Sequence, residues 1–103
     1  MPYIEKGLRK FFDVKIQDVI DELHLLPRYE RIGVVNYVIT KIVLGHLGNA
    51  PTYASYNAAI GVLECAKMEL YRKRVAFYED VKARLNGDVY EEDPNEPVCS
   101  DSD

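Results

Sequence analysis

The chain has 103 residues, 48% of them hydrophobic, and a net charge of −4 at pH 7. This length suits one domain with a modest core. No apolar run approaches the roughly 20 residues that a membrane-spanning helix needs, and the first residues lack the long apolar run and cleavage site of a secretory signal. We therefore expect a soluble, cytoplasmic protein without a membrane partner.

The negative charge is concentrated at the end of the sequence. Six acidic residues and no basic residue follow Tyr90, so this end carries −6 and residues 1–90 carry the remaining +2. Such a weak positive charge does not predict nucleic-acid binding. Residues 91–103 combine acids, prolines and serines with almost nothing to bury, which predicts disorder. The sequence thus predicts a single helical domain over residues 1–90 and an acidic, disordered tail over residues 91–103.

The first predicted helix lies between Asp13, which is suited to cap its beginning, and Pro27, which ends it. The aromatic and apolar residues of segment 3–12 predict a short helical turn or an arm packed on the body, because Gly7 weakens a longer helix. The apolar residues of the helix recur every three or four positions, as on one face of an amphipathic helix. They are Ile16, Val19, Ile20, Leu23 and Leu26.

The spacing of apolar residues predicts a second helix over residues 32–47, with Gly48 as its C-terminal cap. The β-branched run over residues 34–44 also fits a strand, although its apolar residues do not alternate strictly and it is long for a strand. We favour the helix. Its apolar face contains Val35, Ile39, Ile42, Val43 and Leu47.

A third helix is predicted from Tyr53 to Leu85, capped by Thr52 and stopped by Asn86 and Gly87. At about 1.5 Å per residue it is roughly 50 Å long. A compact chain of this size has a diameter of only about 33 Å, from a radius of gyration near 13 Å. The predicted helix is therefore too long for its own globule.

The first half of this long helix is also apolar on most of its sides, which two shorter helices cannot cover. We therefore expect an all-α fold, a helical bundle of about three helices with one long C-terminal helix, packed in a homo-oligomer. The simplest form is a two-fold dimer. The alternative is a helix that kinks and folds back within one subunit.

Two asparagines with neighbouring tyrosines interrupt the apolar stretches: Asn36 beside Tyr37, and Asn57 beside Tyr56. Because buried amides must form hydrogen bonds, we expect the two asparagines to pair across the interhelical seam and fix its register. The functional alternative is a pocket in which the tyrosines stack on a planar ligand and the asparagines bind its edges.

A basic and aromatic cluster in the third helix is the candidate anion site. Tyr71, Arg72 and Arg74 offer charge-assisted hydrogen bonds to phosphates and a ring for stacking. Glu64 interrupts apolar residues further up the helix, and carboxylates near basic partners tend to have shifted pKa values. Acidic neighbours partly neutralise the cluster, which favours a solvated helix face. The candidate ligand-binding residues are Asn36, Tyr37, Tyr56, Asn57, Glu64, Tyr71, Arg72 and Arg74.

A metal-dependent reaction has little support. His24, His46, Cys65 and Cys99 do not form a zinc pattern, and each histidine suits a helix end. No Gly-rich phosphate loop, GxSxG elbow or Cys–His pairing is present, so we expect no catalytic residue, no metal and no cofactor. The acids that a magnesium-dependent nucleotide hydrolase would need fit its paired spacing poorly: Asp18, Asp21, Glu64, Glu69, Glu79 and Asp80.

Three segments carry a resemblance to a known group of proteins: NYVITKIVLGHL, YASYNAAIGVLECAKMELYRKRV and FYEDVKARLNGDVY. Over most of residues 1–90 the chain resembles a short, uncharacterised family from tailed bacteriophages and environmental sequences, with an MPYI start, an NYxIT helix and a C-terminal NGDVY. The family has no established activity, so the resemblance assigns no catalytic or binding residue. It implies a phage or bacterial cytoplasmic setting and a fold that ends at Tyr90.

Three hypotheses for the function follow from these patterns. The leading one is a non-enzymatic, homo-oligomeric helical protein that acts by contact, with itself and with a host or phage protein as partners. The alternative is a binding protein that sequesters a small anionic ligand such as a nucleotide, where Tyr and Arg residues of two subunits meet. A metal-dependent nucleotide hydrolase is the third and least supported hypothesis.

Overall fold

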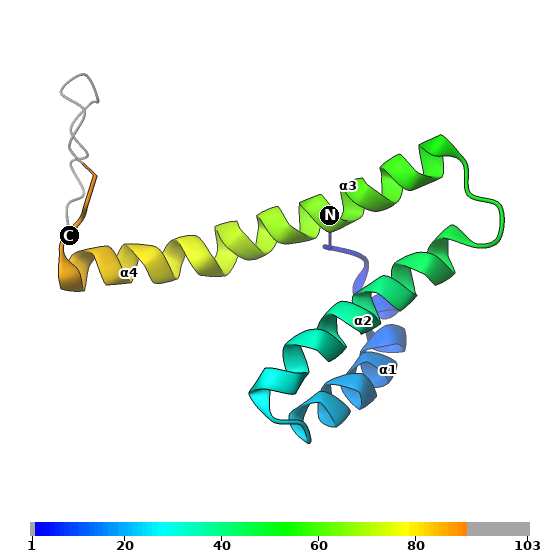
Figure 1. Cartoon of the computed structure of the whole chain (residues 1–103), viewed down its shortest axis with the longest axis horizontal. Helices are drawn as coiled ribbons and strands as arrows, with labels where there is room; N and C mark the ends of the chain where they lie inside the picture. The colour runs from blue at the N-terminus through cyan, green and yellow to red at the C-terminus, as the bar shows by residue number, and fades with distance from the viewer. Residues whose placement is uncertain (1, 91–103) are drawn as a thin grey trace. The chain divides into compact units, whose positions relative to one another are not determined.

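The computed structural model describes residues 2–90, which are all-α, as the sequence predicts, and contain no strand. The chain divides into two compact units, residues 1–67 (unit 1) and residues 68–103 (unit 2). The predicted acidic tail, residues 91–103, lies outside the described residues. In chain order the elements are α1 (Lys6–His24), α2 (Arg28–Leu47), α3 (Tyr53–Leu70), the π-helical segment η1 (Tyr71–Val75) and α4 (Ala76–Asn86) (Figure 1).

The first helix is longer than the sequence pattern predicts. α1 begins at Lys6, so the prediction of a helix that begins at Asp13 is wrong. The apolar spacing continues upstream, because Leu8 and Phe12 stand four residues apart and Phe12 stands four residues before Ile16. Asp13 therefore lies inside a helix that has already begun. Gly7 falls in the first turn and does not interrupt it.

Pro27 separates the first two helices and also begins the second. α1 ends at His24, and after the short connection over residues 25–27 the backbone amides of Glu30 and Arg31 both donate to the Pro27 carbonyl oxygen at 3.1 Å. α2 consequently begins at Arg28, one turn before the predicted residue 32. The two histidines stand in the last turns of α1 and α2, as predicted.

The Arg31 side chain fastens the end of α1 to α2. Its Nε donates to the Leu23 carbonyl oxygen and its Nη2 donates to the Leu26 carbonyl oxygen, both at 3.1 Å. Carbonyl groups at the end of a helix have no partner within the helix. The Leu23 carbonyl oxygen also accepts from the Leu26 amide at 3.1 Å, so the partly buried guanidinium adds a second partner there and binds the Leu26 carbonyl oxygen of the connection.

The predicted end of α2 and the predicted beginning of α3 are confirmed. Gly48 follows Leu47 with a φ of 73°, and its amide donates to the Leu44 carbonyl oxygen at 3.1 Å. Such a positive φ favours glycine. Thr52 and Ser55 then cap α3 reciprocally: the Ser55 amide donates to Thr52 Oγ1 at 3.2 Å, and the Thr52 amide donates to Ser55 Oγ at 2.7 Å.

All residues from Tyr53 to Asn86 are helical, and Gly87 follows with a φ of 89°, so the predicted stop at Asn86 and Gly87 is confirmed. No non-helical residue interrupts this stretch. The sequence did not reveal η1, where the helix changes over five residues to π-helical hydrogen bonding.

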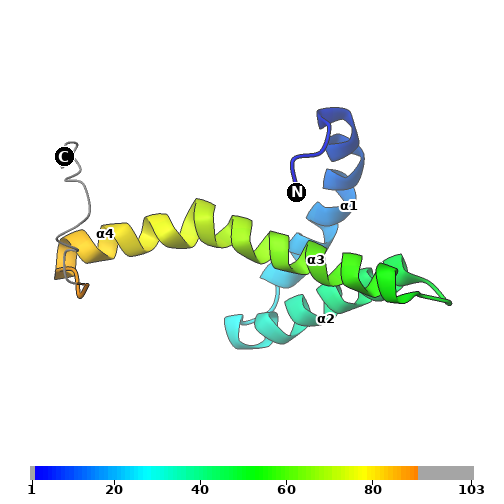
Figure 2. The ribbon, with the colours of Figure 1, turned by 90° about the horizontal axis from the view of Figure 1, so that it is seen from above.

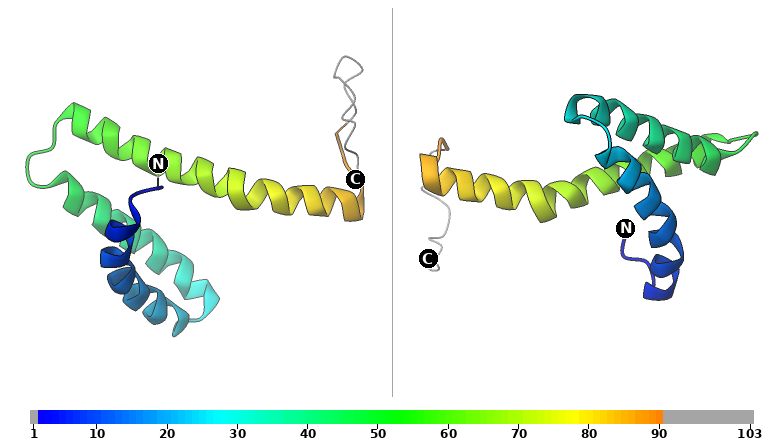
Figure 3. Two further views of the ribbon diagram at one scale, coloured as in Figure 1. Left: turned by 180° about the vertical axis from the view of Figure 1, so that it is seen from behind. Right: turned by 90° about the horizontal axis from the view of Figure 1, so that it is seen from below.

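Few apolar side chains of the described residues are covered. Within residues 2–90 only Ala59 is buried, with 4% of its surface exposed. In unit 1 the helices α1 and α2 meet next to the turn that joins them and separate towards their other ends (Figure 2 and the right-hand view of Figure 3). The apolar residues at this meeting point include Val19 and Leu23 of α1, Leu26 of the connection, and Val34 and Val38 of α2.

We predict that Arg31→Met lowers the free energy of unfolding by about 2 kcal/mol, because two charge-assisted hydrogen bonds, one to α1 and one to the connection after it, are lost. Arg28→Met is the matched control, since Arg28 stands one turn earlier on the same helix, and it should change the free energy by less than about 0.5 kcal/mol. Urea unfolding followed by circular dichroism at one fixed protein concentration measures both. Equal effects of the two substitutions would contradict the role of Arg31.

Candidate interaction surfaces

Four large aliphatic residues form an exposed stripe along α2. They are spaced three, four and three residues apart, so they share one face of the helix. This is also the spacing of the core positions of a coiled coil, which fits another helix laid along it. We call the stripe the α2 face. Its members and their exposed fractions are Ile32 (76%), Val35 (37%), Ile39 (45%) and Ile42 (67%).

The surface is hollowed near each end of the α2 face. The first hollow, of about 400 Å³, adjoins Ile32 and Val35. The second, of about 250 Å³, lies between α2 and α3 and adjoins Ile42. Its other lining residues are Val43 and His46 of α2 and Ala59 and Val62 of α3. The α2 face therefore offers both an apolar stripe and recesses beside it.

A second exposed apolar surface lies on α1, and we call it the α1 face. The rings of Phe11 and Phe12 meet edge to face with 5.3 Å between their centroids. The Lys15 ammonium lies 4.1 Å from the Phe11 ring centroid, a cation–π contact. Leu8 and Val19 extend this surface in both directions at helical spacing, and all five residues are exposed.

The charges of α1 are divided between its two halves. The first half contains four basic residues and one acidic residue, whereas the second contains three acidic residues and no lysine or arginine. This order is unfavourable for the helix, because the macrodipole is positive at the beginning of a helix and negative at its end. Each charge near a helix end costs about 0.3–1 kcal/mol of stability. Within residues 2–90 none of these charges takes part in an ion pair. They are Lys6, Arg9, Lys10, Asp13 and Lys15, then Asp18, Asp21 and Glu22.

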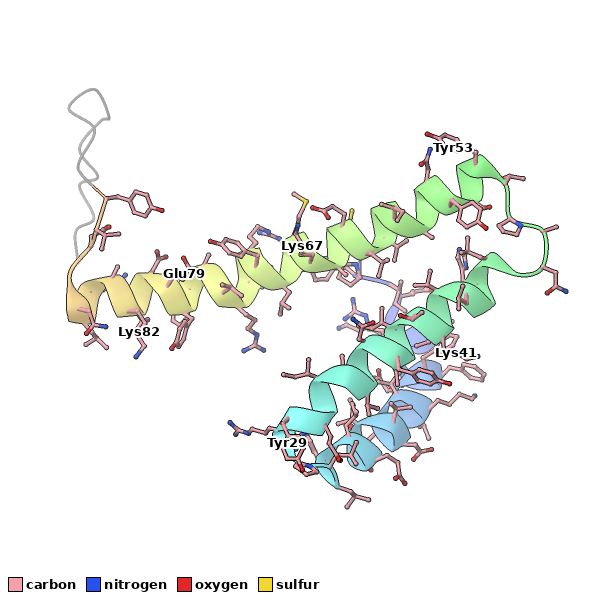
Figure 4. All side chains as sticks on the ribbon, in the orientation of Figure 1. Tyr29, Lys41, Tyr53, Lys67, Glu79 and Lys82 are labelled. Atoms are coloured by element: carbon pink, nitrogen blue, oxygen red, sulfur yellow. The ribbon has the colours of Figure 1, made fainter. Side chains whose placement is uncertain are left out.

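In unit 2 the predicted basic cluster coincides with η1. π-helical segments are rare, and they occur frequently at functional sites. A π-turn holds one residue more than an α-turn, so the side chains that follow are rotated by about 100° relative to an unbroken α-helix. Figure 4 shows side chains on all sides of α4, with Glu79 and Lys82 labelled.

The extra residue of η1 explains an unusual contact. The Tyr71 hydroxyl donates to Glu79 Oε1 at 3.4 Å and to Oε2 at 3.5 Å, although the two residues are eight positions apart. In an α-helix residues seven positions apart lie on one face, two turns apart, and a π-turn lengthens this spacing to eight. The negative charge of Glu79 raises the pKa of Tyr71 above its ordinary value of 10.0, because it disfavours the phenolate.

The basic residues of η1 differ in their partners. Arg72 Nη2 donates to both carboxylate oxygens of Glu69 at 3.1 Å. Lys73 and Arg74 are exposed and form no ion pair within residues 2–90. Within the described part of the chain, Lys73 and Arg74 of η1 are therefore two positive charges without an ion pair.

The sequence-predicted binding residues are distributed over both units. Asn36 and Tyr37 lie on α2, and Tyr56, Asn57 and Glu64 lie on α3, all in unit 1. The remaining three residues lie in η1 of unit 2. They are Tyr71, Arg72 and Arg74.

The expected pairing of Asn36 with Asn57 across the interhelical seam is absent from the described residues. Asn36 and Asn57 are both exposed, and Asn36 accepts hydrogen bonds from the Thr40 hydroxyl of its own helix, at 2.8 Å to its carbonyl oxygen and 3.3 Å to Oδ1. Glu64 is also exposed and pairs with Lys67 at 3.1 Å. The sequence contains a signal for this bond, because Thr40 stands four residues after Asn36 and a threonine hydroxyl in a helix can donate to the carbonyl group four residues before it.

No group of three or more His, Cys, Asp and Glu residues within residues 2–90 is arranged to hold a metal ion. None of the helices in this part combines the length and apolar character that crossing a bilayer requires.

These elements define a small all-α protein with exposed apolar helix faces. Residues 1–89 match the family described as a domain of unknown function (DUF6899), and the chain belongs to this family. The match ends beside Tyr90, the predicted edge of the domain. No curated protein and no solved structure matches the chain.

We predict that Glu79→Gln lowers the pKa of Tyr71 towards its ordinary value, because the neutral amide no longer opposes formation of the phenolate. Asp80→Asn should lower the pKa less, since Asp80 is the weaker of the two influences. NMR of protein with labelled tyrosine rings, titrated through pH 10, measures both shifts, and Tyr71→Phe assigns the signal. A larger effect of Asp80→Asn would show that the register across η1 is different.

Proposed function

We propose that this chain is a non-enzymatic helical protein that works through self-association, with further copies covering the apolar faces that one chain leaves exposed. The observation that supports this is that only Ala59 is buried within residues 2–90. Folded domains normally bury many large aliphatic side chains, and extended apolar surfaces mark interaction sites. Here α1, α2 and α3 all present such side chains to solvent.

The magnitudes favour contact through more than one face. Complete burial of an isoleucine or valine side chain contributes about 1.5–3 kcal/mol. The exposed parts of the α2 face equal about two whole side chains, which gives about 3–7 kcal/mol for each copy. Association itself costs about 4–15 kcal/mol in lost freedom of movement. Two α2 faces in contact roughly offset this loss, so a stable oligomer needs a further surface such as the α1 face.

The setting is part of the same proposal. The MPYI start, the NYxIT segment and the C-terminal NGDVY resemble proteins of tailed bacteriophages, which supports a phage or bacterial cytoplasmic location. A host or phage protein would then bind the assembled oligomer, since the apolar faces of the separate chains are used in assembly.

We predict that the purified chain has a mass in solution of at least twice 11.8 kDa at micromolar concentration. Size-exclusion chromatography with light scattering measures it. A wild-type mass of one chain at these concentrations would overturn the proposed self-association, whatever any variant does.

Variants of α2 test whether its exposed stripe is one of the covered faces. Ile39→Glu places a charge in the stripe, and burial of an unpaired charge is strongly unfavourable, so the mass should fall. Lys41→Glu is the control on the same helix, outside the stripe, and should leave the mass unchanged. If both variants keep the wild-type mass, other faces hold the oligomer together.

A second candidate function is binding of a small anionic ligand such as a nucleotide at η1. Two observations favour it: a π-helical segment coincides with the basic cluster, and Lys73 and Arg74 are not engaged in ion pairs within the described residues. Arginine forms paired hydrogen bonds with phosphate oxygens, and the Tyr71 ring offers a surface for stacking.

We predict for this second function that a nucleoside triphosphate at 100 times its dissociation constant adds about 2.7 kcal/mol of stability, a rise in Tm on the order of 10 °C. Thermal-shift measurements with nucleotides test it. Arg72→Ala with Arg74→Ala should abolish the shift, whereas Lys82→Ala, on α4 of the same unit, should preserve it. A shift that survives the double substitution would place the ligand elsewhere, and no shift with any nucleotide would remove the hypothesis.

A further inference from the structure

The two halves of α1 have opposite charge, and this pattern is directional. The first half, residues 6–15, carries a net +3, and the second half, residues 16–24, carries −3 with histidine neutral. Positive charge at the beginning of a helix and negative charge at its end are both unfavourable for the helix itself. Neither half is neutralised by an ion pair within residues 2–90. Arg9 Nε donates to the Ile4 carbonyl oxygen at 2.6 Å and Asp21 accepts from Gln17 Nε2 at 2.8 Å, but these local contacts do not pair the two halves with opposite charge.

The exposed apolar residues of α1 lie beside these charges. Lys15 sits over the Phe11 ring, so its charge is part of the α1 face. Asp18 and Glu22 stand three residues after Lys15 and Val19 respectively, and a three-residue step connects neighbours on a helix surface. The α1 face thus has a basic, aromatic end and an acidic end.

We propose that α1 pairs in antiparallel orientation with α1 of a second copy, so that the basic half of each helix lies on the acidic half of the other. This inference rests on the proposed self-association and names one of its surfaces. A two-fold axis near residue 16 of α1 places Arg9 of one copy close to Glu22 of its partner copy and Lys15 close to Asp18. The exposed rings of Phe11 and Phe12 are covered in the same contact.

Charge complementarity identifies the occupant as a second copy. A two-fold contact is self-complementary, so every surface group meets the matching region of the same sequence. A net +3 segment and a net −3 segment of one helix satisfy this requirement only when the helices run antiparallel, because a parallel pair would place like charges together. A polyanion such as nucleic acid would be attracted by the first half of α1 and repelled by the second.

The experiment uses two charge-reversed forms of the full chain. The acidic form carries Arg9→Glu and Lys15→Glu, and the basic form carries Asp18→Lys and Glu22→Lys. Each form alone places like charges opposite each other, so we expect its self-association to weaken at least about tenfold relative to wild type. An equimolar mixture should regain wild-type mass by light scattering, because α1 then carries a net −4 in one form and a net +4 in the other.

A matched control places the same number of acidic reversals on unit 2, as Lys82→Glu with Arg84→Glu. This control should keep the wild-type mass, and the basic form mixed with it should not gain the mass that the acidic form restores. If both α1 forms keep the wild-type mass, or if mixing restores nothing, the antiparallel pairing is wrong. A wild-type oligomer would still support the proposed function in that case, whereas a wild-type monomer would overturn both.

A second measurement covers variants that fail to fold, which circular dichroism would reveal. It uses the wild-type chain at about 0.01 M and about 1 M salt, where the Debye length falls from about 30 Å to about 3 Å. The dissociation constant of the oligomer should be about tenfold higher at high salt, because salt screens the contacts between the charged halves. Unchanged or tighter association at high salt would overturn the pairing.

Discussion

Unit 1 is constrained by where its helices touch. α1 and α2 come together beside the turn over residues 25–27, where the Arg31 guanidinium binds the Leu23 and Leu26 carbonyl groups. α2 and α3 line a common hollow beside the turn over residues 48–52. α1 and α2 separate away from their turn, which leaves the apolar residues in the first half of α1 exposed. The α2 face runs along most of α2, and its most exposed members, Ile32 and Ile42, lie near the two ends of the helix. Contacts beside the turns therefore leave this stripe uncovered along its whole length.

The sequence pattern was sufficient for the class of fold and for the features set by single residues. Gly48 and Gly87 end helices with positive φ, and Thr52 caps α3 through Ser55. These helix ends depend on the residue type at one or two positions, which can be read from the sequence. The beginning of α1 was missed because Asp13 is an excellent cap in isolation, yet the apolar stripe of the helix already starts at Leu8. A periodic pattern that continues past a capping residue was the stronger signal.

The candidate site was harder to predict, because it depends on register and exposure. Asn36 and Asn57 stand among apolar residues in the sequence, which suggested burial, but a residue between apolar neighbours on a helix can face the opposite side. Neither helix propensity nor the spacing of apolar residues indicates η1. A π-helical turn differs from an α-helical turn by only one residue. The contact between Tyr71 and Glu79 follows from that change and could not be predicted without it.

The exposed apolar faces and the divided charge of α1 contribute differently to the proposed association. Apolar burial supplies most of the free energy of association but is not directional, so the α2 face alone would accept a helix in either orientation. Charge order contributes less free energy and selects orientation and partner. A helix with basic residues Arg9 and Lys15 in one half and acidic residues Asp18 and Glu22 in the other distinguishes an antiparallel copy of itself from a parallel one. In the proposed antiparallel pair, contacts between the two copies offset the unfavourable position of these charges relative to the α1 macrodipole.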